Sequence, residues 1–436
     1  MNQNNEFSPS NLFQQSGIGI HSNSDNKISI TSTGGATAML LQNGRVIGWG
    51  ASLVPPEIAK LRDIVSLSST DYAFAALRAN RSVVAWGGQK YGGQVPSEIA
   101  KLQDIVSLSA TDYAFAALRA NRSVVAWGAW GNDYSSSQIP PDIAQLQDIV
   151  SISATGNTFA AIRANGSVVA WGYPDYGGQV PSEIAQLQDI ISLSSIDNNF
   201  IVRRANLRLV TWGRGPSIPP EIARWQDIVS LSKTYGAFAA LRVDRSVVAW
   251  GDQKYGGQVP PEIATLRDIV SLSATNSTFA ALRADRSVIS WGDISIPPEI
   301  AKLKDIISLH SVIGSYRING LFAALRADRS VVSWGSIGSA SPEIAKLKDI
   351  VSLSAAKNAF AALRANGSVV TWGYQANNYG SVISGSNVQV PPGIARLQDI
   401  ISISASKNSF AALRRNGQMV AWNTNNDNIV HSEYDD

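Results

Sequence analysis

Short stretches that alternate apolar with small polar residues recur along almost the whole chain. In one of them, residues 104–109 read Asp-Ile-Val-Ser-Leu-Ser, a pattern that predicts a half-buried β-strand. Residues 115–119 and 123–127 are rich in valine, alanine and aromatic residues and predict two further short strands. In the clearest copies, such as Asn165-Gly166, an Asn-Gly dipeptide lies between these two strands. Asn-Gly is typical of a two-residue type I′ turn, so the sequence predicts a β-hairpin.

This three-strand pattern is one copy of a unit that ends in Trp-Gly. The ten registered tryptophans, the last of them followed by asparagine, are Trp49, Trp86, Trp127, Trp171, Trp212, Trp250, Trp291, Trp334, Trp372 and Trp422. Successive tryptophans are 37 to 50 residues apart, a period typical of repeat architectures. A unit of this size cannot bury its own apolar faces, so the units must stack on one another.

Between one unit and the next, the chain reads Pro-Pro-Glu-Ile-Ala or Pro-Ser-Glu-Ile-Ala, which favours a single helical turn or an extended edge segment. The hairpin strands are nearly continuous apolar runs, so both faces of each small sheet must be covered. We therefore predict an all-β protein, a β-propeller of about ten repeats of roughly 40 residues with three to four short strands each. Two alternatives remain, an open β-superhelix and a leucine-rich-repeat solenoid. The second is suggested by residues 298–309, although its period of 20 to 29 residues is too short.

The sequence divides into three parts. Residues 28–422 form the repeat array, which we predict to be one propeller-like domain. Residues 1–27 are rich in asparagine, glutamine and serine and predict a disordered polar segment, and residues 423–436 form a polar C-terminal tail. Residues 1–27 have no apolar core of the kind that secretory signal peptides carry, and no stretch approaches the length of a transmembrane helix. We expect a protein that does not insert into membranes and is either cytoplasmic or exported without such a signal.

Charge and cysteine content narrow the function classes. Of the 436 residues, 36 are Lys or Arg and 33 are Asp or Glu, and these charges are spread through the repeats without a basic stripe, so we expect no nucleic-acid binding. The chain has no cysteine, which excludes disulfides and thiolate metal sites. The three histidines, His21, His310 and His431, are far apart, and no metal-ligand, nucleophile or phosphate-binding motif is present. The sequence therefore predicts a protein that is not an enzyme and has no cofactor or metal.

Two charged residues recur in nine of the units. Aspartate begins the first strand at Asp63, Asp104, Asp148, Asp189, Asp227, Asp268, Asp305, Asp349 and Asp399, and arginine precedes the hairpin turn at Arg78, Arg119, Arg163, Arg204, Arg242, Arg283, Arg326, Arg364 and Arg414. A catalytic pair would not need nine copies. We interpret these residues as structural, capping turns or pairing between neighbouring units.

The repeat resembles that of the regulator-of-chromosome-condensation superfamily. The resemblance rests on Ala117-Leu118, Val124-Val125 and Ala126-Trp127-Gly128, with residues 92–96 (Gly-Gly-Gln-Val-Pro), and it covers about residues 28–422. It looks closest to the shorter repeat of the bacterial propeller-type β-lactamase inhibitor. The chain departs from the family in reading Ala114-Phe115 where a His-Ser pair is common, and in having ten units where seven blades are usual. The resemblance implies a propeller that presents loops from one face to another protein.

Sites specific to this chain are expected in the loops, where the copies differ. Tyr72 and Tyr113 match the loop that supplies aromatic contacts in the inhibitor-like relatives, and exposed aromatic residues on loops are typical interface anchors. The predicted partner-binding residues are Tyr72, Tyr113, Trp130, Tyr134, Tyr235, Tyr316 and Arg317. Of these, Trp130 and Tyr134 lie in one unique insertion, and Tyr316 and Arg317 lie in another. The repeated Tyr91, Tyr176 and Tyr255 are interpreted as closing the turn after Trp-Gly.

These residues lead to one preferred function and two alternatives. The preferred function is a non-enzymatic protein-binding scaffold, either an inhibitor or an exported bacterial effector, whose partner is another protein. The first alternative is a lectin, in which repeated loop residues bind glycans. The second is a nucleotide-exchange factor for a small GTPase, although no insertion matches an exchange wedge.

Overall fold

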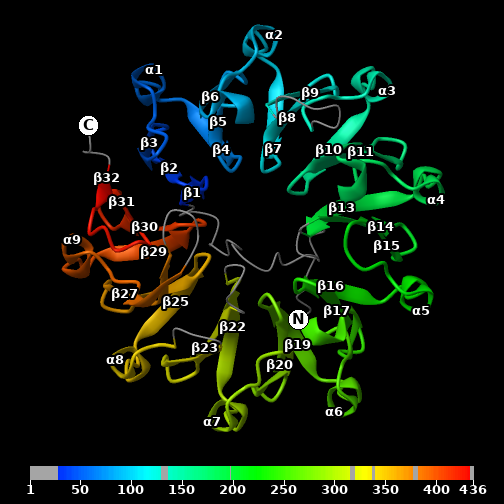
Figure 1. Cartoon of the computed structure of the whole chain (residues 1–436). Coiled ribbons are helices and arrows are strands. Elements are labelled where there is room, and N and C mark those ends of the chain that lie inside the picture. The colour runs from blue at the N-terminus through cyan, green and yellow to red at the C-terminus, as the bar shows by residue number, and fades with distance from the viewer. Residues whose placement is uncertain are drawn as a thin grey trace, which may run out of the picture.

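The computed structural model describes residues 28–128, 136–196, 198–314, 320–335, 339–376 and 382–432. Within these ranges the strands form ten small antiparallel sheets, which are arranged as a ring with the short helices on its outer rim (Figure 1). We number the sheets as units 1 to 10 in chain order. No helix in the described ranges is long and apolar enough to cross a membrane.

Each unit begins with an edge strand and continues with a middle strand and a third strand, which is the second edge of the sheet in units 1 to 8. The first strands are β1 (Ser29–Ser32), β4 (Ile64–Ser69), β7 (Ile105–Ala110), β10 (Ile149–Ala154), β13 (Ile190–Ile196), β16 (Ile228–Lys233), β19 (Ile269–Ala274), β22 (Ile306–Val312), β25 (Ile350–Ala355) and β29 (Ile400–Ala405). The middle strands are β2 (Ala36–Leu40), β5 (Ala73–Arg78), β8 (Ala114–Arg119), β11 (Thr158–Arg163), β14 (Asn199–Arg204), β17 (Ala237–Arg242), β20 (Thr278–Arg283), β23 (Leu321–Arg326), β26 (Ala359–Arg364) and β30 (Ser409–Arg414).

The third strands are β3 (Val46–Gly50), β6 (Val83–Gly87), β9 (Val124–Gly128), β12 (Val168–Gly172), β15 (Leu209–Gly213), β18 (Val247–Gly251), β21 (Val288–Gly292), β24 (Val331–Gly335), β27 (Val369–Ala376) and β31 (Met419–Asn423). Units 9 and 10 add a fourth strand, β28 (Val382–Asn387) and β32 (His431–Ser432), so part of the segment that follows residue 423 belongs to a sheet.

Single-turn helices connect successive units. They are α1 (Pro56–Ala59), α2 (Ser97–Ala100), α3 (Pro141–Ala144), α4 (Ser182–Ala185), α5 (Pro220–Ala223), α6 (Pro261–Ala264), α7 (Pro298–Ala301), α8 (Pro342–Ala345) and α9 (Pro392–Ala395). Three 3₁₀ turns follow Trp-Gly, η2 (Gln89–Tyr91), η3 (Pro174–Tyr176) and η4 (Gln253–Tyr255). Of the two forms that the sequence left open for the Pro-Pro-Glu-Ile-Ala segment, the structure has the helical turn.

The all-β propeller of ten repeats with three to four strands is confirmed, and both alternatives are wrong. A leucine-rich solenoid has one strand per repeat, whereas each unit here is a sheet of at least three. An open superhelix would leave its first and last units apart. Here unit 1 and unit 10 share a core of buried residues that includes Ile28, Met39, Ala411 and Leu413.

The core lies between successive units. Phe115 and Trp127 of unit 3 stack with their ring centroids 5.3 Å apart, and both pack against Ala75 and Leu77 of unit 2. The middle strand is covered on both faces, as Ala116 and Ala117 are fully buried. This is why the middle strand reads as a continuous apolar run rather than an alternating one.

The repeated aspartate and arginine pair within a unit, not between units. Arg119 Nη2 lies 3.0 Å from Asp104 Oδ2, and an ion pair between the two repeated residues is present in all nine units that carry them. The backbone N–H of Ala120 also donates to the Asp104 carbonyl, so the aspartate holds the start of the first strand beside the hairpin turn. The pairing between neighbouring units that the sequence left open is therefore wrong, and the pair instead holds the hairpin turn of its own unit.

The hairpin turns are present, but they are not type I′ turns. A I′ turn needs a positive φ at both central residues. Here only the residue after Asn or Asp has one, for example Gly166 (φ 76°) and Arg122 (φ 64°). Each turn is instead a tight turn followed by one left-handed residue, the arrangement of a three-residue hairpin loop. Glycine is therefore preferred at a single position, and six units place arginine or leucine there.

The ring is closed by a tryptophan hydrogen bond similar to those that join other units, but with a side-chain acceptor. The indole N–H of Trp127 donates to the Gly92 carbonyl of the preceding unit at 3.0 Å. At the junction, Trp49 Nε1 of unit 1 donates to the Asn423 side-chain oxygen of unit 10 at 2.7 Å. The Trp49 ring also stacks on His431, with centroids 4.3 Å apart. Unit 10 thus takes the place of a unit that would precede unit 1.

Gly166 and Gly417 occupy the same turn position with similar φ angles. They allow the cost of backbone strain to be measured separately from the cost of steric crowding. A Cβ on Gly166 would lie 2.5 Å from the Gln188 carbonyl oxygen, whereas the nearest contact of a Cβ on Gly417 would be 3.6 Å away. We expect Gly417→Ala to cost about 1 kcal/mol from strain alone. Gly166→Ala should cost about 1–3 kcal/mol more, because the next unit must shift. Thermal unfolding of both variants measures the difference, and equal midpoints would contradict it.

Asn423 provides a test of ring closure. Its side-chain oxygen accepts from both Trp49 Nε1 and Ser409 Oγ, at 2.7 and 2.9 Å. Asn423→Ala should leave the buried indole N–H of Trp49 without its partner, at a cost of about 1–3 kcal/mol. Hydrogen exchange should show the loss of protection concentrated in units 1 and 10. Uniform loss around the ring would contradict closure through this bond.

Candidate protein-binding surface

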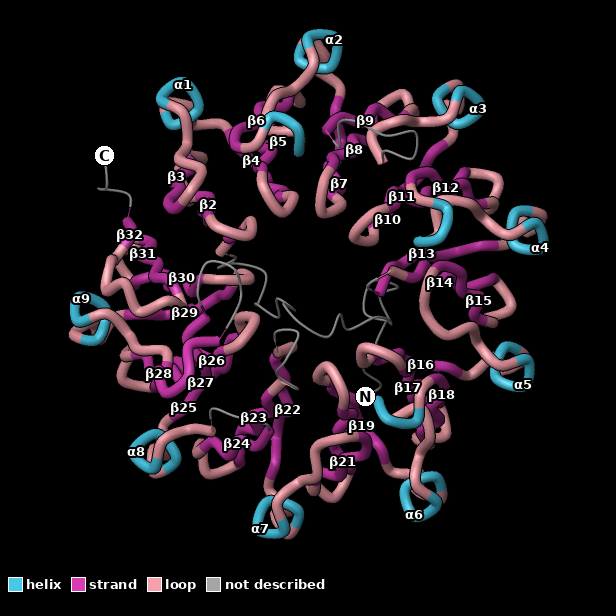
Figure 2. Tube along the Cα trace, in the orientation of Figure 1, coloured by secondary structure: helices cyan, strands magenta, loops and turns pink. Residues whose placement is uncertain are grey.

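The loops between the first and middle strands lie at the inner ends of the units, on the side opposite the rim helices (Figure 2). In unit 2 this loop reads Thr70-Asp71-Tyr72. The Thr70 hydroxyl accepts the backbone N–H of Ala73 at 2.9 Å and donates to the Tyr91 carbonyl at 3.1 Å. Thr70 is buried, so the loop is fixed both to its own strand and to the segment after Trp-Gly.

Backbone hydrogen bonds join the inner loops of successive units. Gly34 N–H donates to the Asp71 carbonyl, Asp71 N–H to that of Asp112, and Asp112 N–H to that of Gly156, at 2.7 to 2.9 Å. Units 1 to 4 are linked in this way, and Lys357 and Lys407 make the same bond between units 9 and 10 at 3.2 Å. In these units the inner loops are therefore connected to one another rather than independent projections.

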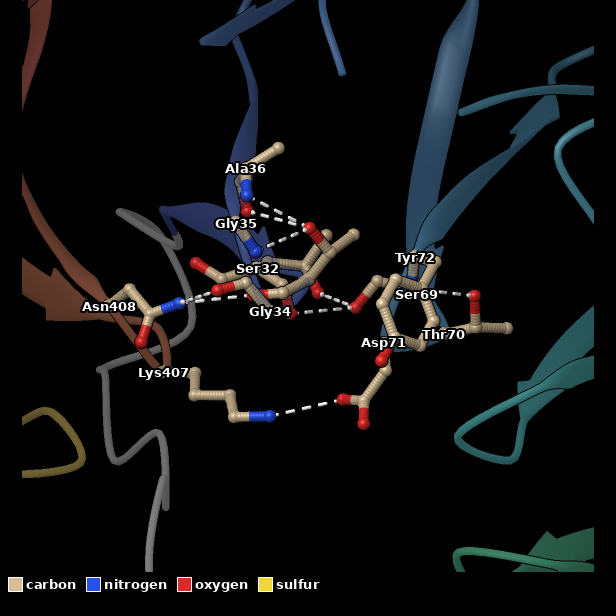
Figure 3. Close-up of polar contacts among 12 residues, drawn as sticks. Ser32, Gly34, Gly35, Ala36, Ser69, Thr70, Asp71, Tyr72, Lys407 and Asn408 are labelled. Atoms are coloured by element: carbon tan, nitrogen blue, oxygen red, sulfur yellow. Dashed lines mark hydrogen bonds and ion pairs between the residues drawn. The ribbon is translucent and has the colours of Figure 1, made fainter. Parts of the chain in front are cut away.

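An ion pair crosses the first unit. Lys407 Nζ of unit 10 lies 3.0 Å from Asp71 Oδ1 of unit 2, over the side-chain-free loop of Gly34 and Gly35 in unit 1 (Figure 3). The nearby Lys357 has a pKa below its ordinary value, because its burial and the charge of Lys407 both disfavour protonation. Residues from both ends of the chain thus meet in one charged group.

Asp112 of unit 3 lies in the same group but forms no hydrogen bond or ion pair through its carboxylate with any other described residue. A Cβ on Gly156 of unit 4 would lie 2.7 Å from Asp112 Oδ2, so the carboxylate rests where the next unit has no side chain. Burial, and then the charge of Asp71, raise the pKa of Asp112 to about 6, against a smaller opposing effect of Lys407. The Asp112 carboxyl therefore changes its charge near neutral pH.

Three tyrosines from two neighbouring units pack in a row, and the last of them, Tyr113, follows Asp112 in the chain. The ring centroids of Tyr72 and Tyr91 are 4.3 Å apart, and those of Tyr91 and Tyr113 are 6.0 Å apart. Tyr72 is 50% exposed and Tyr113 37% exposed, which is high for aromatic residues. Burial, then the charges of Asp112 and Asp71, raise the pKa of the Tyr113 hydroxyl. We call Tyr72, Tyr91, Tyr113 and Asp112 the tyrosine surface.

Tyr91 also has a structural role, as the sequence suggested. It ends the 3₁₀ turn η2, and the following Gly92 has a left-handed φ of 93° that leaves its carbonyl free to accept from Trp127. A Cβ on Gly92 would lie 2.6 Å from the Phe115 ring, so no side chain fits there. Tyr255 and Gly256 repeat this arrangement in unit 6, where Trp291 is the donor.

The structure brings together two of the seven predicted binding residues, Tyr72 and Tyr113. Tyr235 is 67% exposed but lies in unit 6, at the loop position that corresponds to Asp71, and it packs against Tyr255. It therefore does not join Tyr72 and Tyr113. The remaining predictions, Trp130, Tyr134, Tyr316 and Arg317, lie outside the described residues.

Sequence reasoning missed Asp71, Asp112, Lys357 and Lys407. Each occupies the loop position just before the expected tyrosine or asparagine, so the variation at that position was the available signal. In the described part of the chain, no three histidine, aspartate or glutamate side chains are grouped so that they could hold a metal ion.

No model of a known protein family matches the chain, and no curated protein sequence matches it. Among solved structures, it is similar to the ectodomain of the receptor kinase CR4 from Physcomitrella patens, with 19% identity, 63% of this chain and 76% of that chain covered, and a TM-score of 0.37. It is also similar to Prp20p from Saccharomyces cerevisiae, with 17% identity, 82% of each chain covered, and a TM-score of 0.31.

A third similar structure is yeast RCC1 (Prp20) with Kap60 bound, at 15% identity, 97% of this chain and 85% of that chain covered, and a TM-score of 0.29. The relationship to a bacterial inhibitor stays a prediction.

The raised pKa of Asp112 predicts a pH-dependent stability. Because the folded state binds this proton more tightly than the unfolded chain, Asp112 lowers stability as the pH rises from about 4 through 6. Asp112→Asn should therefore raise the free energy of unfolding by about 1–3 kcal/mol at pH 7.5 and change it little at pH 4.5. Urea unfolding at several pH values measures this, with Glu262→Gln on the rim as the control for a lost charge. Parallel curves for Asp112→Asn and wild type would refute it.

Proposed function

We propose that this protein is a non-enzymatic scaffold that binds another protein through its inner loops, with the tyrosine surface as the main contact. The observation that carries the proposal is the exposed pair Tyr72 and Tyr113, joined through Tyr91. Large aromatic side chains that stay exposed on an ordered surface are typical anchors of protein interfaces.

The order of the loops supports this role. The backbone bonds from Gly34 through Asp71 and Asp112 to Gly156 hold the tyrosines in place before any partner binds. A surface that is already ordered loses little conformational entropy on binding. More specifically, we propose that the protein is an inhibitor or an exported effector, as the resemblance of its repeat to that of bacterial inhibitors suggests.

The carbohydrate alternative is less well supported. A lectin built from repeats would carry equivalent pockets, but the described aromatic groups of the loops differ from unit to unit. Tyr72, Tyr91 and Tyr113 span units 2 and 3, whereas Tyr235 packs on Tyr255 from a different loop position. One uneven surface fits a single protein partner better than several sugars.

Photo-crosslinking tests the proposal. A benzoylphenylalanine placed at Tyr72 or Tyr113 should give an adduct with one partner in extracts of the source organism or of organisms it lives with. The same group at Val243, which is 68% exposed on a hairpin turn of unit 6, should give none. Tyr113→Ala should reduce the adduct at position 72 about tenfold or more, since anchors commonly contribute 2 kcal/mol or more. Equal adducts at Val243, or none at the tyrosines, would overturn the proposal.

A further inference from the structure

We propose that the tyrosine surface binds a cationic side chain, arginine or lysine, of the protein partner, with Asp112 as its counter-charge. This inference rests on the proposed function and names the chemistry that the partner must present. It follows from an unpaired carboxylate, the row of rings that ends at the neighbouring Tyr113 and the arrangement of charges around both.

Asp112 is unlike the other aspartates of the repeats. The nine aspartates that begin first strands each pair with an arginine, and Asp71 pairs with Lys407 at 3.0 Å. The Asp112 carboxylate has no such partner among the described residues, although it is partly buried against Gly156. A partly buried carboxylate without a counter-charge is unfavourable, and a cation from outside would remove that cost.

The neighbouring rings suit the same ligand. A guanidinium or ammonium group is attracted to the face of an aromatic ring, and Tyr72, Tyr91 and Tyr113 offer a row of three rings whose successive centroids are 4.3 and 6.0 Å apart. Asp112 and Asp71 lie near enough to Tyr113 to raise the pKa of its hydroxyl, so the carboxylates and rings share one electrostatic environment. An anionic ligand would be repelled here.

The chain itself contains a similar contact between an ammonium group and a carboxylate. Lys407 places its ammonium group on Asp71, one unit away from Asp112, with the Tyr72 ring directly following Asp71 in the loop (Figure 3). Lys407 is held by Asp71 and so leaves Asp112 available. The charged groups that act on Asp112 are Asp71, which repels its negative charge, and Lys407, which attracts it.

The test uses the full chain and labelled octapeptides of glycine and serine that carry three arginines, three lysines, three glutamines or three glutamates. Fluorescence anisotropy at pH 7.5 and low salt should show the arginine peptide binding at least tenfold more tightly than the glutamine peptide. Asp112→Asn should remove most of this preference. Equal binding of the arginine and glutamine peptides, or binding of neither, would overturn the inference.

The pH dependence gives a second readout. Since the pKa of Asp112 is about 6, about one carboxyl in ten is ionised at pH 5, and the arginine peptide should bind about tenfold more weakly there. Asp112→Asn should show no such change. A pH dependence that is the same in wild type and Asp112→Asn would assign it to another group and overturn the role of Asp112.

A matched pair of tyrosines separates binding from folding. Tyr91 and Tyr255 have the same place in the repeated turn, but only Tyr91 belongs to the tyrosine surface. Tyr91→Ala should weaken the arginine peptide severalfold, while Tyr255→Ala, with a similar cost to stability, should not. If crosslinking identifies a partner at Tyr72 but the arginine peptide does not bind, only the inference of a cation site is refuted. If no partner is found at Tyr72, the proposed function is refuted as well.

Discussion

The whole ring depends on one contact, the packing of a Phe–Trp pair from each of units 2 to 10 against the middle strand of the unit before it, which is rich in alanine in most units. In unit 3 the pair is Phe115 and Trp127, and the surface that receives it includes Ala73 and Ala75, which are completely buried. The large residues supply the apolar area and the alanines let the sheets approach closely. A larger side chain in place of Ala75 would hold two sheets apart, and the same displacement would pass to the ring as a whole.

The second contact between units is the hydrogen bond that the tryptophan indole N–H donates, and it is not present in every unit. It finds a carbonyl when the preceding loop contains the Tyr-Gly-Gly turn, as with Trp212 and Gly177. Trp86 and Trp250 follow short loops, and their buried indole nitrogens have no hydrogen-bond partner among the described residues. Trp422 follows the long loop of unit 9, and its indole nitrogen also has no partner among the described residues. Packing therefore determines the interface, and the hydrogen bond is an addition that the local conformation of the preceding loop permits. This explains how loops of very different length can vary around a constant core.

Much of the fold could be predicted because its signals are local and repeated. The strand at residues 105–110 was evident from alternation, and the count of units followed from the tryptophans. The predicted type I′ turn was wrong because Asn-Gly is compatible with more than one type of hairpin turn. Only the backbone angles show that Asn165 lacks the positive φ that a type I′ turn needs. The partner of Asp104 could not be chosen from sequence either, since Arg119 of the same unit and the arginine of a neighbour are equally repeated.

The binding surface was only partly predictable, because it depends on contacts that exist only in the closed ring. Tyr72 and Tyr113 could be selected by their position in the repeat, but Lys407 and Asp71 are 336 residues apart in the chain. Closure brings them together, and the two glycines of unit 1 leave room for the ion pair between them. Because Lys407 is committed to Asp71, the equivalent carboxylate of the next unit, Asp112, is left unpaired. The bond that helps to close the ring and the charge available to a partner are therefore consequences of the same arrangement.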